Sequence, residues 1–142
     1  MTNEDRIENS TGANLFVYGT LRKGFPSHEL LQRLRARFVA TAYLRGQLYD
    51  LGEYPGAVES ADARDRIYGE VYWLPHSARA FSVLDKFEGF DPLRPRFNLF
   101  ERKKTRVTLA GGAETEAWIY WLHGFRRSGR RVPSGDYMKC RA

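Results

Sequence analysis

The sequence holds a single cysteine, Cys140, and this scarcity excludes several kinds of site. One cysteine cannot form an intrachain disulfide, and it cannot supply the cysteine pair of a typical zinc site. The three histidines are far apart and lack a metal-binding spacing such as H-E-x-x-H, so we expect no metal site. Because proteins of reducing compartments use few cysteines in this way, we expect a cytoplasmic location.

Long apolar runs are also missing. No stretch approaches the ~20 apolar residues that a membrane-spanning helix needs, so we expect no membrane partner. The N-terminal segment lacks the apolar core of a secretory signal, and residues 1–13 are predicted to be a flexible polar leader. Hydrophobic residues make up 42% of the chain, and no repeat or linker divides residues 14–142, which are predicted to form one domain.

Acidic residues are scarce in the C-terminal third. Residues 1–93 carry 11 Lys and Arg against 13 Asp and Glu, whereas residues 94–142 carry 12 against 4. A basic face can attract nucleic acids, acidic lipids or a small anion, but it can also simply keep a protein in solution. Because no nucleic-acid-binding motif accompanies the basic runs, we favour a solvated face and do not expect a nucleic-acid partner.

Hydrophobic patterning predicts several strands and two short helices. One helix begins after Ser27, and a second covers residues 77–88 and ends at Gly89. The expected strands cover residues 15–18, residues 38–50 with a break at Gly46, residues 66–74, and a hairpin around Gly111 and Gly112. The segments 51–58 and 125–140 are interpreted as a turn-bearing connection and an irregular tail. This content indicates an α+β fold with a small barrel-like sheet.

The strand at residues 15–18 runs into a polar turn between Gly19 and Gly24. These glycines have the spacing of a nucleotide-binding phosphate loop, but Phe25 and Pro26 stand where that motif needs its lysine and hydroxyl. We therefore expect no binding site for a nucleoside triphosphate. Successive backbone N–H groups at a strand end can still bind a carboxylate or a phosphate, although the segment alone favours an ordinary turn.

Glu88 occupies an unusual position in the second predicted helix. At 100° per residue it lies between Phe81 and Leu84 on the apolar face, which Phe87 shares and Asp85 borders. A core-facing carboxylate loses hydration, so its pKa rises and it can accept a proton near neutral pH. The helix C-terminus is also an unfavourable place for a negative charge. A structural carboxylate that reaches solvent or pairs with a basic residue is the alternative, and the pattern leaves both open.

Taken in order, these segments resemble the γ-glutamylcyclotransferase-like family, in particular its small bacterial and γ-glutamylamine branch. The matching segments are FVYGTLRKG, HELL, GQLYDLGEYPG, YGEVYWL, LDKFEG, AWIYW and PSGDY. They fall between residues 15 and 137. The resemblance implies a small mixed, mostly antiparallel β-barrel flanked by short helices. It also implies an enzyme that releases 5-oxoproline from a small-molecule γ-glutamyl amine or peptide, without a cofactor.

The same resemblance assigns roles to individual residues. Glu88 is expected to be the catalytic acid/base, which takes a proton from the substrate ammonium and returns one to the departing amine. Backbone N–H groups of the turn after the first strand are expected to hold a carboxylate or the developing oxyanion. The expected substrate-binding residues are Tyr18, Gly19, Thr20, Leu21, Tyr54, Pro55 and Tyr120.

The chain also departs from the family pattern. Phe100 stands two residues before Arg102, where family members often have tyrosine, and the loop after Glu88 carries Asp91 and two prolines. Such loops contact the leaving group, so the resemblance implies a reaction type and does not imply a particular amine. The sequence leaves the oligomeric state open. A non-catalytic module on the same scaffold, which binds a small carboxylate or a protein, is the alternative.

Overall fold

The computed structural model describes residues 12–124 and 129–140, so the predicted leader lies almost entirely outside the described residues. Within them, seven strands form one sheet in the order β3-β2-β4-β1-β6-β5, β7 pairs with β2, and pairing of β5 with β2 closes a barrel. Only the β1–β6 pairing is parallel in the described chain. The elements are β1 (Ala13–Val17), α2 (His28–Arg33), β2 (Arg37–Asp50), β3 (Pro55–Glu59), β4 (Arg66–Leu74), α3 (Ser77–Glu88), the 3-10 turn η1 (Pro95–Phe97), β5 (Phe100–Leu109), β6 (Glu114–Leu122), β7 (Arg130–Val132) and α4 (Tyr137–Cys140). The predicted α+β fold with a small, mostly antiparallel barrel is confirmed.

Side chains of β1 alternate between two apolar cores. Phe16 belongs to the cluster that fills the barrel, together with Ile119 of β6. Leu15 and Val17 belong to a second cluster, which also contains Leu84 of α3 and lies between the barrel wall and the helices. This period of two is what a strand covered on both faces requires. β1 therefore connects the barrel interior with the layer that carries α2 and α3.

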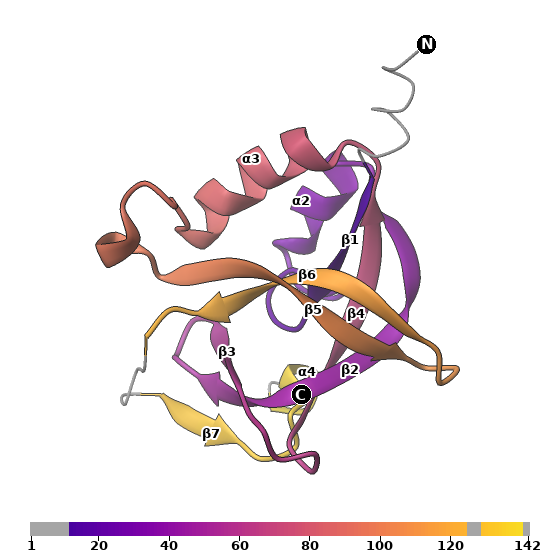
Figure 1. Ribbon diagram of the computed structural model, residues 1–142, viewed down its shortest axis with the longest axis vertical. Helices are drawn as coiled ribbons and strands as arrows, with labels where there is room; N and C mark the ends of the chain where they lie inside the picture. Colours follow the sequence, from indigo (N-terminus) through magenta and orange to yellow (C-terminus); the bar gives the residue numbers. More distant parts are fainter. Residues whose placement is uncertain (1–11, 125–128, 141–142) are drawn as a thin grey trace.

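The helices α2 and α3 lie over the same side of the barrel (Figure 1). α3 has the predicted bounds, and Gly89 follows it in the left-handed conformation, with φ 73°. Phe81 and Leu84 are buried as expected, but Phe87 is 47% exposed because it lies in the last turn, at the rim of a pocket described below. Nowhere in the described chain is a helix both long and apolar enough to cross a membrane.

β2 is continuous, so the predicted break at Gly46 is wrong. The strand instead changes its partner at this residue, because it pairs with β4 up to Arg45 and with β3 from Gly46 onward. A side chain at this position would collide with the side chain of Ile67 and the carbonyl oxygen of Val58. Glycine is therefore required by close packing and not by a turn.

Two segments without a predicted regular structure contain short elements. β3 lies within the segment interpreted as a connection, and β7 and α4 lie within the segment interpreted as an irregular tail, of which residues 125–128 are outside the described residues. β7 pairs with β2 through Leu48 and Val132, and both Val132 and Tyr137 are buried in the barrel cluster. These elements depend on tertiary contacts, which a local pattern does not reveal.

Candidate active site

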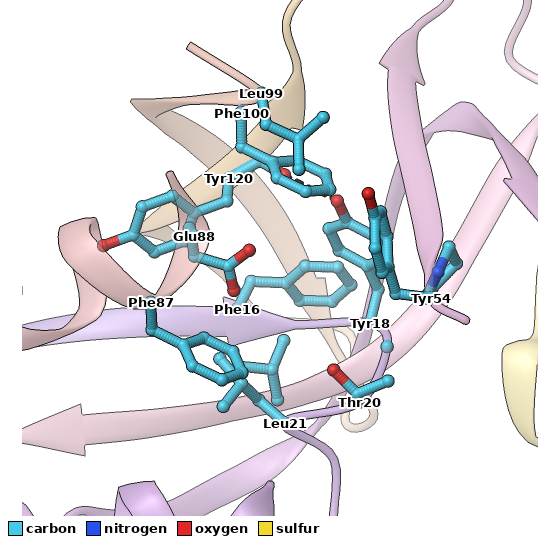
Figure 2. Close-up of a pocket in the computed structure, with 13 residues that line it drawn as sticks. Phe16, Tyr18, Thr20, Leu21, Tyr54, Phe87, Glu88, Leu99, Phe100 and Tyr120 are labelled. Carbon is cyan, nitrogen blue, oxygen red and sulfur yellow. Dashed lines mark hydrogen bonds between the residues drawn. The ribbon is translucent and has the colours of Figure 1, made fainter. Parts of the chain in front are cut away.

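A pocket opens where the end of β1 meets the C-terminus of α3 (Figure 2). Its cavity volume is about 120 Å³. The lining residues come from β1 and the turn after it, the start of β3, the end of α3, and strands β5 and β6: Phe16, Val17, Tyr18, Gly19, Thr20, Leu21, Tyr54, Pro55, Phe87, Glu88, Leu99, Phe100 and Tyr120. Glu88 and all seven residues predicted to bind substrate therefore lie around one cavity.

The Glu88 side chain points from the last turn of α3 into this cavity (Figure 2). Within the described residues, its carboxylate has neither a hydrogen-bond donor nor a cationic partner. Burial, which is the larger cause, and the negative charge of Asp85 together raise the pKa of Glu88 to about 8. A carboxyl group with this pKa can take up and release a proton near neutral pH.

The turn at residues 19–21 also lines the cavity. The carbonyl of Gly19 accepts a hydrogen bond from the Arg22 N–H at 3.0 Å, which closes the turn. The N–H groups of Gly19, Thr20 and Leu21 have no hydrogen-bond acceptor in the part of the chain that the structure describes. Consecutive N–H donors without acceptors at the wall of a pocket form an anion-binding concavity.

Gly19 permits the close approach of Pro55 to this turn. A Cβ atom at position 19 would lie 2.6 Å from Cγ of Pro55, which no ordinary packing contact allows. Tyr54 precedes this proline and packs edge to face on Phe100, with the ring centroids 5.9 Å apart. Leu51 N–H donates to the Tyr54 carbonyl at 2.9 Å and closes the connection that carries both residues. The turn at 51–54 thus forms the wall beside Gly19.

Tyr18 and Tyr120 form walls of the pocket, and their hydroxyl groups bond to the protein itself. The Tyr18 hydroxyl donates to the Tyr120 carbonyl at 2.6 Å and accepts from the Ala57 N–H at 3.3 Å. The Tyr120 hydroxyl donates to Asp85 Oδ1 at 2.6 Å and points away from the cavity (Figure 2). Burial, together with the nearby Glu88 charge, raises the pKa of Tyr18 well above its ordinary value. These hydroxyl groups therefore hold the two tyrosine rings in place as walls of the pocket.

A charged cluster that the sequence pattern does not reveal lies behind α3. Asp85 accepts hydrogen bonds from Arg102 Nε at 2.8 Å and from one terminal nitrogen of Arg102 at 3.1 Å, in addition to the bond from Tyr120. Asp85 had been noted only as a residue at the edge of the apolar face. The pattern could not reveal the pair, because the two residues lie 17 positions apart on different elements.

A second cluster anchors the turn that follows β1. Arg22 is 8% exposed, and it pairs with Glu70 at 3.0 Å and with Asp136 at 2.9 Å. Glu70 also accepts hydrogen bonds from the Lys23 N–H at 3.2 Å and the Tyr72 hydroxyl at 3.0 Å. These residues belong to the segments FVYGTLRKG, YGEVYWL and PSGDY, so three of the quoted motifs meet in one buried network. That these residues fall within the segments that resemble the family was the one sequence signal for this network.

The pocket wall is mostly apolar. Glu88 is the only carboxylate among the lining residues, and none of them is lysine, arginine or histidine. No group of three histidine, cysteine, aspartate or glutamate side chains among residues 12–124 and 129–140 is arranged to hold a metal ion. The chemical groups available in the cavity are therefore one proton-exchanging carboxyl group, backbone donors and aromatic surfaces.

Comparison with known proteins identifies the family. The family model described as gamma-glutamyl cyclotransferase, AIG2-like, matches residues 15–139. The gamma-L-glutamyl-butirosin B gamma-glutamyl cyclotransferase of Niallia circulans is 32% identical over 129 residues, which cover 90% of this chain and 72% of that relative. The gamma-glutamylcyclotransferase family protein YtfP of Escherichia coli K12 is 30% identical over 126 residues, which cover 87% of this chain and 95% of that relative.

A solved structure shows the same fold. The AIG2-like protein from Mus musculus aligns with a TM-score of 0.67 and 21% identity, over 82% of this chain and 80% of the mouse chain. The sequence match spans both the turn after β1 and the end of α3, which are the two sides of the pocket. The chain therefore belongs to the gamma-glutamyl cyclotransferase, AIG2-like family.

Proposed function

We propose that this protein releases 5-oxoproline from a γ-glutamyl amine or peptide, with Glu88 as the general acid/base. The observation that carries the proposal is a partly buried carboxylate without a partner among the described residues, which shares one small cavity with a turn whose three backbone N–H groups have no acceptor among those residues. Family membership supports the reaction class, since curated relatives are named as γ-glutamyl cyclotransferases.

The first chemical requirement is deprotonation of the substrate. The α-ammonium of a γ-glutamyl compound is mostly protonated at neutral pH, because an α-amino group has a pKa of about 8. Because the pKa of Glu88 is raised to about 8, it accepts this proton at a smaller free-energy cost than an ordinary glutamate would. The neutral nitrogen then has a lone pair that attacks the γ-carbonyl carbon.

Ring closure then proceeds through a tetrahedral intermediate. A bond forms between the α-nitrogen and the γ-carbon, and the γ-amide C–N bond breaks. The two protons that the α-ammonium gives up are delivered to the leaving nitrogen, which departs as an ammonium ion, and Glu88 carries them one at a time. Because the nucleophile and the carbonyl belong to one molecule, holding the chain in its folded shape supplies much of the rate.

The backbone donors of residues 19–21 suit the single carboxylate at the glutamyl end of the substrate. Three N–H groups can neutralise one anion by hydrogen bonding, and no cationic side chain lines the cavity to do so instead. The aromatic residues Tyr54, Phe87 and Phe100 provide the apolar surface against which the aliphatic part of the substrate and the leaving amine can pack.

A panel of γ-glutamyl compounds tests the proposal. The purified protein is incubated with γ-glutamyl amines, amino acids and peptides, and 5-oxoproline is measured beside the Glu88→Gln variant. We expect turnover of at least one compound by the wild type and a loss of about 10³-fold or more in the variant. Thermal stabilisation by these compounds without any turnover would instead support a binding module and overturn the catalytic assignment.

A further inference from the structure

Asp85 lies one helical turn before Glu88 on α3, and it has three hydrogen-bond donors. Arg102 of β5 supplies two of them, at 2.8 and 3.1 Å, and the Tyr120 hydroxyl of β6 supplies the third at 2.6 Å. Side chains three positions apart on a helix are neighbours on its surface. Asp85 is therefore near enough for its charge to act on Glu88, although its carboxylate lies in a separate groove with Arg102. Within the described residues, Asp85 has a cationic partner and Glu88 has none.

Arg102 is itself held in place. Its guanidinium lies 4.2 Å from the ring centroid of Phe81 and 4.8 Å from that of Trp118, so aromatic faces enclose it. The Arg102 and Asp85 side chains are only 19% and 18% exposed. A charge pair with two hydrogen bonds and low solvent exposure is rigid, because opening it would leave both charged groups without their hydrogen-bond partner.

Tyr120 joins this cluster to the pocket wall. Its hydroxyl bonds to Asp85, and its carbonyl accepts the hydrogen bond from the Tyr18 hydroxyl. A continuous series of short bonds thus runs from Arg102 through Asp85 and Tyr120 to Tyr18, around the cavity that contains Glu88. Displacement of the last turn of α3 would break it.

We propose that Asp85 is a positioning residue for Glu88. Held by Arg102 and Tyr120, it fixes the last turn of α3 and keeps a negative charge beside Glu88, which makes Glu88 a stronger base. The catalytic part of this inference rests on the proposed function, whereas the electrostatic part concerns the protein alone. A nearby negative charge raises the pKa of Glu88, and a carboxylate with a higher pKa removes a proton from an ammonium group more readily.

The other ionisable groups around the two carboxylates do not offset this effect. Tyr18, Tyr54 and Tyr120 line the cavity of Glu88 from the neighbouring elements. Burial raises the pKa of Tyr18 and of Tyr120, so these two phenols are neutral near pH 7. On the far side of α3, Lys104 and Glu116 lie in the groove that contains Asp85 and Arg102. Lys104 and Glu116 face each other at 4.0 Å, so their charges largely compensate.

A titration of Glu88 by carbon NMR tests the electrostatic part directly. The protein is labelled at glutamate carboxyl carbons, and the Glu88 signal is identified by its loss in Glu88→Gln. We expect Asp85→Asn to lower the pKa of Glu88 by roughly one unit, because a neighbouring negative charge is removed. We expect Arg102→Gln to raise it, because Asp85 keeps its charge and loses its neutralising cation.

The opposite directions of the Glu88 pKa shift in Asp85→Asn and Arg102→Gln distinguish this electrostatic effect from a simple loosening of the C-terminal end of α3. Loosening would hydrate Glu88 and lower its pKa in both variants. Asp91→Asn is the matched control, since Asp91 also lies three residues from Glu88 but is exposed in the following loop, and it should shift the pKa by less than about 0.3 unit. If Asp85→Asn leaves the pKa unchanged, or if Arg102→Gln lowers it, the inference is wrong.

Activity provides the second readout and keeps the two proposals distinguishable. With a turned-over substrate, the acid limb of kcat/KM should move to lower pH in Asp85→Asn and to higher pH in Arg102→Gln. Failure of the proposed function would appear as an absence of turnover in the wild type, while the NMR titration still decides the role of Asp85. Should Asp85→Asn not fold, the sign of the Arg102→Gln shift alone decides it.

Discussion

At the scale of single residues, Glu88 occupies a position that disfavours its charged form. Its pKa is raised to about 8 by burial and by the Asp85 charge, whereas an unfolded glutamate titrates near 4.5. The folded protein therefore binds a proton here that the unfolded chain has already lost, and this favours folding at low pH. The contribution is complete below about pH 4.5 and disappears as the pH rises through about 8.

This linkage predicts a pH-dependent gain in stability for Glu88→Gln. The amide cannot ionise, so the variant should resemble the wild type at pH 4.5 and exceed it at pH 9, by an amount of the order of a few kcal/mol. Urea unfolding at both pH values measures the difference. Glu53→Gln, in the exposed turn before Tyr54, is the control and should show no such trend.

Gly19→Ala should impair the turn after β1. The added methyl group would meet Cγ of Pro55 at 2.6 Å, so either the turn or the proline must move. Because misplacement of about 1 Å at a binding site can cost 10²-fold, we expect a rise in KM of roughly tenfold or more. Gly111→Ala, whose new Cβ would contact nothing within 4 Å, should leave the kinetics unchanged. Equal kinetics for the two variants would show that the turn does not hold substrate.

The positions of candidate site residues were predictable from the sequence only where a local pattern indicated them. Glu88 could be found because helical periodicity placed a carboxylate on the face of Phe81 and Leu84. The partner of Asp85 could not be found in this way, because Arg102 lies on a different element, β5, and no spacing rule links the two positions. The same limit applied to the Tyr18 hydroxyl, whose acceptor lies 102 residues away on β6.

At the scale of elements, the buried network of Arg22 ties the turn after β1 to β4 and to the segment before α4. Arg22→Met should remove both ion pairs and leave the buried Glu70 and the half-buried Asp136 without their cation. We expect a loss of about 3–5 kcal/mol in the free energy of unfolding. Lys23→Met makes the same change at the adjacent exposed position and should stay within about 0.5 kcal/mol. Urea unfolding of both variants measures this, and equal losses would contradict the assigned role of the network.

Elements with a strong internal pattern were predictable, and elements stabilised by partners were not. α3 has an apolar stripe and a terminal glycine, and β4 is rich in β-branched and aromatic residues. β3 and β7 are short, and each forms because β2 offers backbone partners along its second half. Gly46 was misinterpreted for the same reason, since its cause is close packing against β3 and β4.

At the scale of the whole molecule, the barrel brings distant segments to one end of β1. The turn at 19–21, the turn at 51–54 and the end of α3 lie far apart in the sequence, yet all contribute to the cavity. The sequence order of the motifs was sufficient to predict the family and the barrel. The shared cavity depends on contacts between segments that are distant in the sequence, which no local pattern specifies.

The basic C-terminal third is partly compensated by the same barrel. On β5 and β6, three exposed cations face carboxylates: Lys103 lies 3.9 Å from Glu101, Lys104 lies 4.0 Å from Glu116, and Arg106 lies 3.1 Å from Glu114. Exposed pairs of this kind contribute little to stability, but they reduce the positive potential of the face. This arrangement is consistent with a solvated face, as the charge pattern favoured.

The most direct test of the central claim is 5-oxoproline release by the wild type and by Glu88→Gln, measured with the same γ-glutamyl substrate at pH 8. Thermal melting near pH 5, where both proteins carry a neutral group at position 88, verifies that the variant is folded. We predict turnover in the wild type and a loss of about 10³-fold or more in kcat for the variant, with substrate binding retained. Comparable rates in the two proteins would contradict the assignment of Glu88 as the acid/base.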